Sequence, residues 1–385
     1  MEVRYINKNE EVDFLKISAA SFIWKFDAEE DTGTKVPVLG AFNDGKLIAG
    51  IEMYDFRVNY CGNVVNAIIA SGVCSLPESR RMGGIRAIFD EIGRTAIEND
   101  WTLGFLHPFS IEYYGKFGYA NLNRMFSIKV PFEKLKSIPR STDVVLYTGE
   151  QFDDLSALHD KCAMNENLMG LREDKKHYCD TPLEEADYTY LHYNEAGEAD
   201  GYVRFTVKRP DDLIVEDLYV LNPEALKGIV GFLRNYDGIV KNLIVKKQYQ
   251  GTPFSCLTDG MDNVTYDYNG VAAGRIYNLK KLLEINAYPE EYGKFRVRCI
   301  DSIEQNNGVF EVEYQNGKAT VTKTDGEYDI CLTATAAAKL MLAGEGHTAS
   351  TAVFIDGVTI NGNADDFFRA FPYRVTRFTD SKWSE

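Results

Sequence analysis

A run of apolar residues from Val64 to Leu76 leads into a pair of glycines and then a helical pattern, and this succession constrains the fold more than any other feature of the chain. The run is nearly continuous, as in a central strand covered on both faces. After Gly83 and Gly84, apolar residues recur at helical spacing from 85 to 96, and 101–106 has the pattern of the next buried strand. This order of strand, helix and strand predicts an α/β fold.

The length of 385 residues predicts two to three domains, since a domain averages about 150 residues. Pro139 and the residues up to Thr142 break the periodicity, and the patterns of 144–235 repeat the first region without its glycine pair. This similarity predicts a diverged duplicate. Short strands and a small-residue helix follow from about Tyr288. We therefore expect three domains, at residues 1–140, 141–286 and 287–385.

Periodicity and turn signals also place the main elements. The expected helices are 10–26, 85–96, 152–164, 223–235 and 334–342. A hairpin is expected to join 38–42 to 47–54 through an Asn-Asp-Gly turn. The same residues resemble a phosphate-binding P-loop, but Leu47 stands where Ser or Thr should hold magnesium, so the pattern favours the hairpin.

Charge and composition limit the partners. Lys and Arg number 42 against 58 Asp and Glu, and the net charge of −16 disfavours nucleic acid and anionic lipid and favours cationic partners. The seven cysteines stand singly, without a C-x-x-C pair, as in reduced intracellular proteins. A charged amino terminus and the absence of a long apolar run predict neither a signal peptide nor a membrane span, hence a cytoplasmic protein. The five histidines lack ligand spacing, so we expect no metal.

The turn between strand and helix has the composition of an anion site. Glycines at a helix start let backbone amides approach a ligand, and the helix dipole favours negative charge there. Arg80, Arg81 and Arg86 add positive charge, so a phosphate or pyrophosphate is the expected ligand. An ordinary strand-to-helix turn with surface arginines would show the same spacing.

These residues resemble a known family. Arg80, Gly83 and Ile85 partly fill the R-x-x-G-x-G/A pattern, the acetyl-CoA pyrophosphate loop of the GNAT N-acetyltransferases, and depart from it at Ile85. The enhanced intracellular survival (Eis) family of GNAT proteins has an R-R-x-G-L-L-R-like loop with a branched aliphatic residue at that place, and 80–86 is similar to it. The resemblance implies tandem GNAT folds, of which the second lacks the loop.

Two later segments extend the resemblance over essentially the whole chain. Residues 111–119 resemble the family's Y-G-[RK]-F-G-Y segment, and Tyr114 matches the tyrosine that protonates the departing CoA thiolate. A phenol with a pKa of about 10 keeps its proton at pH 7 and can give it to a thiolate. Residues 328–344 and 360–368 resemble the sterol carrier protein-like domain that closes the family's chains. The family also forms hexamers, which implies a homo-oligomer here.

The resemblance implies an acetyl-CoA site in the first domain. Its expected contacts are Val73, Cys74, Ser75, Arg81, Met82, Gly83, Gly84, Ile85, Arg86, Phe109 and Ser110. In this family the chain's terminal carboxylate takes the proton from the attacking amine, which here implies Glu385. The family's last residue is usually aromatic, whereas here the nearest aromatic, Trp383, precedes the end by two residues, so water or another carboxylate is an alternative base.

The expected function is acetyl-CoA-dependent N-acetyl transfer to an amine of a cationic acceptor, such as an aminoglycoside, a polyamine or a lysine side chain. The acidic residues Asp27, Glu29, Glu30 and Asp31 follow the first expected helix and form either an acceptor wall or a solvated loop. The alternative function is a non-catalytic binding protein, in which the sterol carrier-like domain holds an apolar ligand or a partner.

Overall fold

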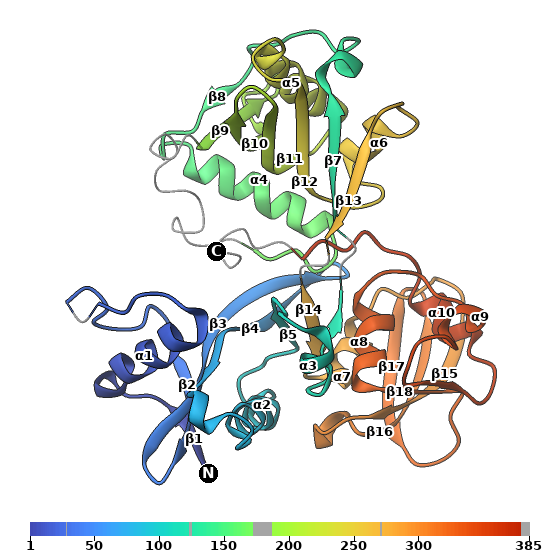
Figure 1. Ribbon diagram of the computed structural model, residues 1–385. Helices are drawn as coiled ribbons and strands as arrows, with labels where there is room; N and C mark the ends of the chain where they lie inside the picture. The colour runs from blue at the N-terminus through green and yellow to red at the C-terminus, as the bar shows by residue number, and fades with distance from the viewer. Residues whose placement is uncertain (28, 123–124, 172–186, 270–271, 379–385) are drawn as a thin grey trace. The chain divides into compact units, whose positions relative to one another are not determined.

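The computed structural model describes residues 1–27, 29–122, 125–171, 187–269 and 272–378 (Figure 1). The chain divides into two compact units. The first unit combines 1–122 with 272–374, and the second contains the described residues of 125–269 together with 375–378. The amino-terminal third and the carboxyl-terminal third of the chain therefore pack in one unit.

The first sheet has seven strands in the described chain, in the order β1-β2-β3-β4-β5-β14-β6. Only β4 and β5 are parallel, because α2 connects them on one face. The strands are β1 (Glu2–Tyr5), β2 (Val38–Asn43), β3 (Lys46–Tyr60), β4 (Asn63–Ser75), β5 (Leu103–Leu106), β6 (Ala120–Asn121) and β14 (Ala273–Ile276). The helices of this part are α1 (Glu11–Phe22), α2 (Gly84–Thr95) and α3 (Ile111–Gly115).

The two faces of this sheet carry separate apolar clusters. Ile88 and Phe89 of α2 pack on one face with Ile51 and Met53 of β3. Phe14 of α1 packs on the other, together with other residues of β2 to β4. Alternation along β3 therefore sends odd-numbered residues toward α2 and even-numbered residues toward α1 in this stretch.

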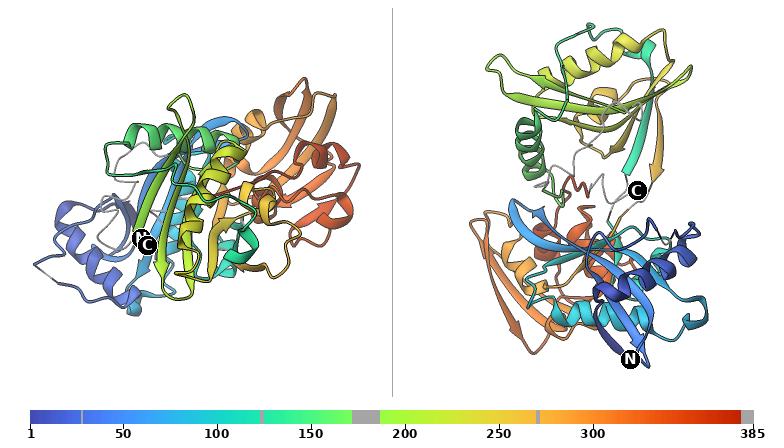
Figure 2. Two further views of the ribbon diagram at one scale, coloured as in Figure 1. Left: turned by 90° about the horizontal axis from the view of Figure 1, so that it is seen from above. Right: turned by 90° about the vertical axis from the view of Figure 1, so that its left-hand side faces the viewer.

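The second unit repeats the arrangement of a sheet between helices. Its seven described strands run β13-β7-β12-β11-β10-β9-β8, with β11 parallel to β12. Helices α4 and α5 cover opposite faces (Figure 2). The strands are β7 (Met125–Pro131), β8 (Val145–Leu146), β9 (Asp187–Tyr193), β10 (Ala199–Lys208), β11 (Asp212–Val220), β12 (Asn242–Gln248) and β13 (Thr265–Asn269); the helices are α4 (Phe152–Asn165), α5 (Pro223–Leu233) and α6 (Pro253–Thr258).

A third sheet belongs to the first unit and has the order β17-β16-β15-β18-β19. Strand β15 alternates strictly between buried and exposed side chains, so only one of its faces is covered. The strands are β15 (Gly293–Ile300), β16 (Gly308–Gln315), β17 (Lys318–Thr324), β18 (Ile330–Thr333) and β19 (Val358–Ile360); the helices are α7 (Leu279–Ile285), α8 (Ala334–Leu342), α9 (Ala349–Ala352) and α10 (Asp365–Ala370).

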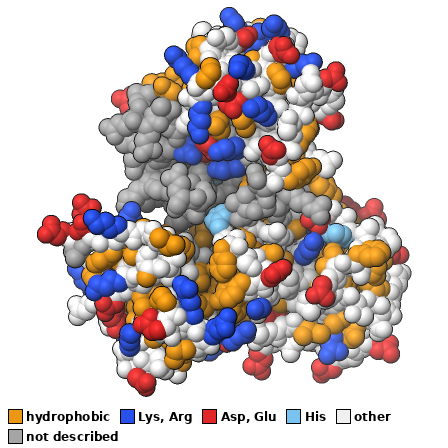
Figure 3. All heavy atoms as spheres, viewed as in Figure 1, with side chains coloured by type: hydrophobic (Ala, Val, Ile, Leu, Met, Phe, Trp, Pro, Cys, Tyr) orange, Lys and Arg blue, Asp and Glu red, His pale blue; other side chains and the backbone are white. Residues whose placement is uncertain are grey.

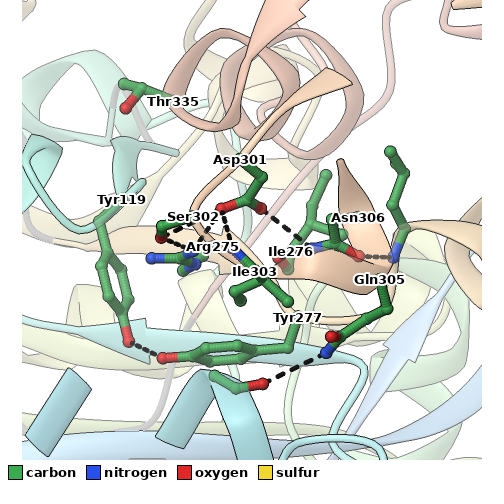
Figure 4. Close-up of polar contacts among 12 residues, drawn as sticks. Tyr119, Arg275, Ile276, Tyr277, Asp301, Ser302, Ile303, Gln305, Asn306 and Thr335 are labelled. Carbon is green, nitrogen blue, oxygen red and sulfur yellow. Dashed lines mark hydrogen bonds and ion pairs between the residues drawn. The ribbon is translucent and has the colours of Figure 1, made fainter. Parts of the chain in front are cut away.

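A buried ion pair joins the first sheet to the segment that follows β15 (Figure 4). The Arg275 guanidinium on β14 lies 2.6 Å from the Asp301 carboxylate, and the two side chains are 4% and 2% exposed. Asp301 also accepts hydrogen bonds from the Asn306 side chain and the Ile303 amide. Because each remaining acceptor is occupied, the charge of Asp301 is well compensated.

The α/β fold expected from the sequence is confirmed, and each expected helix is present with limits that differ by a few residues. The hairpin at the P-loop-like segment is also confirmed, since Asp44 and Gly45 have positive φ values of 49° and 77° between β2 and β3. Strands β7 and β14 were not expected. They place 125–131 in the second sheet and 273–276 in the first. The chain therefore passes from the first compact unit to the second near 122 and returns near 272. The three-domain division at 140 and 286 uses other limits and stays a prediction.

The described residues contain neither a membrane-spanning helix nor a cluster of metal ligands. No helix among them is long and apolar enough to cross a membrane. The same residues contain no group of three or more His, Cys, Asp or Glu side chains placed to hold a metal ion.

We predict that Asp301→Asn destabilises the first unit by about 3–5 kcal/mol, because Arg275 then remains buried without its counter-charge. Urea unfolding followed by circular dichroism measures the loss. The matched control is Asp325→Asn, at an exposed position, with an expected change within about 0.5 kcal/mol. The double variant Arg275→Met/Asp301→Leu should recover part of the stability, and equal stability of Asp301→Asn and the control would contradict the prediction.

Candidate functional site

The parallel pairing of β4 with β5 ends early and leaves an open strand edge. The two strands pair only from Ala67 to Ile69, opposite Leu103 to Phe105. On its other side β4 stays paired with β3 as far as Ser75. Among the described residues, the backbone of β4 therefore has a partner strand on one side only from Ala70 onward, and its β5-facing amide and carbonyl groups can bind an extended ligand. Val73, Cys74 and Ser75, expected to contact the cofactor, lie on this segment.

After β4 the chain passes through a 3-10 turn at Pro77–Ser79, and helix α2 then begins at Gly84 with unpaired amides. Its first hydrogen bond runs from the Ala87 amide to the Gly83 carbonyl, so the amides of Gly84, Ile85 and Arg86 have no carbonyl partner in the helix. Gly83 has a φ of 89°, and a Cβ there would meet no atom within 4 Å, so the space in front of the helix start is open. The residues present therefore fit a pyrophosphate.

Gly84 has a different role at the same turn. It is buried, and a Cβ on it would lie 3.1 Å from the Cβ of Ala49 on β3. This close approach sets the start of α2 against the sheet, beside the end of β4. The first glycine thus leaves room for the ligand, and the second allows the helix to pack.

Positive charge surrounds the helix start. Arg80, Arg81 and Arg86 are all exposed, as is Met82. In Figure 3 blue side chains gather over the region of α2. The Arg86 guanidinium lies 5.3 Å from the centre of the Phe117 ring, which restrains its position. The expected loop residues are thus brought together by the structure, around the open amides.

Tyr114 is held on the α2 face of the same sheet. It lies on α3, is 3% exposed and packs edge-on against Phe89 of α2, with ring centres 6.2 Å apart. Burial, and secondarily Tyr113, raises the pKa of its phenol above the usual value, so the hydroxyl is protonated at neutral pH. Within the described residues this hydroxyl makes no hydrogen bond, which leaves its proton for a ligand atom.

Phe109 and Ser110, the remaining expected contacts, lie between β5 and α3. The Ser110 hydroxyl accepts a hydrogen bond from the Tyr113 amide and caps α3, so it fixes the start of the helix that carries Tyr114. Phe109 is 77% exposed, and its ring lies 5.4 Å from that of Tyr114. An exposed aromatic ring beside a buried phenol can cover an apolar ligand chain.

The second sheet has the same early end of a parallel pair, and side chains of the second unit line a small cavity beyond it. Strands β11 and β12 pair only from Asp212 to Val215, opposite Asn242 to Val245. Beyond this point a small cavity is lined by Tyr219 and by Arg377 of the carboxyl-terminal segment. The guanidinium of Arg377, 3% exposed, lies 2.8 Å from Glu166 and 4.8 Å from the ring centre of Tyr219. An internal ion pair thus lies beside the end of the parallel pair in the second sheet, whereas exposed arginines surround the helix start in the first unit.

Two sets of expected site residues are not assembled by the structure. Glu385, the expected base, lies outside the described residues, which end at Phe378. Asp27 and Asp31 hydrogen-bond within their own turn: the Asp27 amide donates to the Asp31 carboxylate. Whether this acidic turn forms an acceptor wall therefore stays a prediction.

The sequence analysis missed Glu52 and Gly72. Glu52 lies on β3, and its carboxylate oxygen would be 2.9 Å from a Cβ on Gly72, which has a φ of 54°. A glutamate inside an otherwise apolar strand pattern, Ile51-Glu52-Met53, was the available signal. Its proximity to β4 became visible only through the strand register, which shifts between Gly50 and Glu52.

Comparisons with known proteins agree with this geometry. Family models described as the acetyltransferase (GNAT) domain match residues 2–122 and, separately, 170–271. The N-acetyltransferase Eis of Mycobacterium tuberculosis is 24% identical over 364 residues, which cover 87% of each chain.

Solved structures show the same fold over nearly the whole chain. A protein of unknown function from Enterococcus faecalis superposes with a TM-score of 0.82 at 20% identity and covers 98% of this chain and 97% of its own. Eis1 from Mycobacterium abscessus superposes with a TM-score of 0.79 at 17% identity, covering 99% and 98%.

We predict that Gly83→Asp abolishes acetyl-CoA binding, because the added carboxylate stands where the pyrophosphate is expected and the new Cβ strains a backbone with positive φ. Isothermal titration calorimetry measures the affinity. Gly45→Asp is the matched control: Gly45 also has a positive φ and no atom near its Cβ position, but lies in the β2–β3 turn. Retained affinity in Gly83→Asp, or equal loss in both variants, would contradict the assignment.

Proposed function

We propose that this chain, a GNAT N-acetyltransferase with two GNAT domains, transfers the acetyl group of acetyl-CoA to an amine of a cationic acceptor. The observation that carries the proposal is the alignment, in one sheet, of an open β4 edge, an unpaired helix start and the protonated hydroxyl of Tyr114. The net charge of −16 favours an aminoglycoside, a polyamine or a lysine side chain over an anionic acceptor.

Each part of acetyl-CoA has a matching part of the first sheet. The amides of Gly84 to Arg86 and the nearby arginines bind the pyrophosphate. The free edge of β4 at Val73 to Ser75 hydrogen-bonds the pantetheine arm, and the exposed Phe109 covers it. The thioester is thereby placed between β4 and β5, where the strands separate.

The reaction is a direct transfer. The neutral amine attacks the thioester carbonyl, a C–N bond forms, the C–S bond breaks, and the thiolate takes a proton from the phenol of Tyr114. The nitrogen loses one proton to a base, for which we propose the terminal carboxylate of Glu385, and the Tyr114 phenolate regains its proton from solvent. Desolvation of a carboxylate raises its pKa and makes it a better base.

The second fold and the carboxyl-terminal sheet have other roles in this proposal. Helix α5 starts without the glycine pair and the arginines of the first unit, so we assign acetyl-CoA binding to the first GNAT domain alone. We assign the five-stranded sheet with α8 to α10 to a sterol carrier protein-like domain. The protein acts in the cytoplasm as a homo-oligomer, with a hexamer as the expected form.

A thiol-release assay with acetyl-CoA tests the function. A panel of a polyamine, an aminoglycoside and a lysine peptide separates the acceptor classes. Release of thiol with at least one acceptor supports the transferase. The binding-protein alternative instead predicts none.

We predict that Tyr114→Phe lowers turnover by about 10² to 10⁴-fold, the scale of one general acid, while the affinity for acetyl-CoA is nearly unchanged. Only the hydroxyl is removed, so the packing against Phe89 remains. Tyr113→Phe is the control, since this neighbouring residue is only partly buried and its loss should leave turnover near that of the unmodified chain. Full turnover of Tyr114→Phe would remove this residue from the mechanism.

We predict that the terminal carboxylate is required for turnover but not for cofactor binding. Deletion of Ser384 and Glu385, and separately the addition of two glycines after Glu385, should each depress kcat and leave the calorimetric affinity for acetyl-CoA intact. Glu385 carries two carboxylates, so a side-chain substitution alone would not decide the matter. Normal turnover in both variants would assign the base elsewhere.

A further inference from the structure

Glu52 is a partly buried carboxylate without an ion-pair partner among the described residues, and the positive charge of Lys35 acts on it only from a greater distance. No Lys, Arg or His nitrogen among them lies within 4.0 Å of it. Its one hydrogen bond is from the Tyr54 hydroxyl, at 3.3 Å, to Oε2. The other oxygen, Oε1, has no donor in the described chain and is not closed off from solvent. This differs from Asp301 and Glu166, the other carboxylates of low exposure discussed above, which both face an arginine.

The position of Glu52 is at the mouth of the proposed acetyl-CoA site. Its Oε2 lies against the bare Cα of Gly72, one residue before Val73. Glu52 also lies on the same sheet face as Gly50 and its register partner Cys74, which is the face covered by α1. Tyr114 belongs to the cluster on the opposite face.

This arrangement puts the acid for the departing thiolate and the carboxylate for the acceptor on opposite faces of the sheet. The strands β4 and β5 part beyond Ile69, and Tyr114 and Glu52 belong to opposite faces of the sheet at this place. Tyr114 on one face is placed for the departing thiolate, and Glu52 on the other is placed for the incoming acceptor. An amine that enters from the α1 face would then attack from the side opposite the acid.

The charge of Glu52 identifies the chemistry of its ligand. Desolvation raises the pKa of this carboxyl, and the hydrogen bond from Tyr54 and the positive charge of Lys35 oppose that shift. Burial of a carboxylate without a cation is costly, and a bound ammonium offsets the cost. The thiol of Cys74, on the same face, has its pKa raised to about 12 by burial and by Glu52, so it stays neutral and does not compete.

We propose that Glu52 binds the protonated amine of the acceptor through Oε1 and so sets the preference for alkylammonium acceptors. The proposal rests on the proposed function above. Glu52 is a specificity-determining residue here, and the proton transfers remain with Tyr114 and the terminal carboxylate. A charge-assisted hydrogen bond to Oε1 positions the acceptor nitrogen next to the bare Cα of Gly72 before the nitrogen loses its proton.

The test compares Glu52→Gln with Glu78→Gln, an exposed glutamate just beyond β4. The probes are spermidine, a protonated alkylamine, and aniline, which is neutral at pH 7. We expect Glu52→Gln to raise KM for spermidine about ten- to a hundredfold, the effect of one charge-assisted hydrogen bond, with kcat less affected and KM for aniline unchanged. Glu52→Asp should give an intermediate KM, and Glu78→Gln no change.

Calorimetry separates the failure of this inference from that of the transferase function. If the chain releases no thiol with either amine, the proposed function fails, but a spermidine affinity weakened at least tenfold in Glu52→Gln still supports the amine site. Unchanged KM and affinity for spermidine in Glu52→Gln overturn the inference. An equal KM rise for both amines, or a loss of acetyl-CoA affinity, also overturns it, because a merely structural role would produce that result.

Discussion

The site depends on the short overlap between β4 and β5. Pairing is limited to Ala67–Ile69, and the continued pairing of β4 with β3 holds the free segment in the sheet, with an irregularity at Gly72. A longer overlap would satisfy the backbone groups of Val73 to Ser75 within the sheet and leave none for a ligand. The helix start at Gly84 and the short helix that carries Tyr114 both lie beside this opening, so both can contact a ligand bound there.

The second sheet has the same kind of opening, with a buried ion pair beside it. Its parallel pair also ends early, at Val215 and Val245, and a helix also follows the first strand. The helix α5 starts with Asn222 and Pro223, without the glycine pair and the arginines. Arg377 lies beside the opening, with Glu166 as its counter-charge. One fold thus carries the proposed ligand site in one copy and an internal ion pair in the other.

Carboxylates of low exposure in this chain differ in whether an arginine compensates their charge. Asp301 and Glu166 each face an arginine at 2.6 and 2.8 Å, so their charges are compensated inside the protein. Glu52 has only the hydroxyl of Tyr54. A carboxylate without an ion-pair partner costs free energy, and the position of Glu52 on β3, beside the free segment of β4, is the basis of the proposed acceptor contact.

The sequence by itself determined the local features. Apolar runs and helical spacing gave β4, α2 and the β2–β3 hairpin, and the motifs around Gly83 and Tyr114 identified the family, because each depends on residues close together in the chain. Only the tertiary structure decided which strands pair. Strand β14 pairs with β5, and Arg377 lies at the second opening, although both are far along the chain from their neighbours. Glu52 lies against Gly72 because of a register shift between β3 and β4. Such non-local pairings leave no local pattern in the sequence, since they are set by packing and by the pairing of backbone groups across the whole sheet.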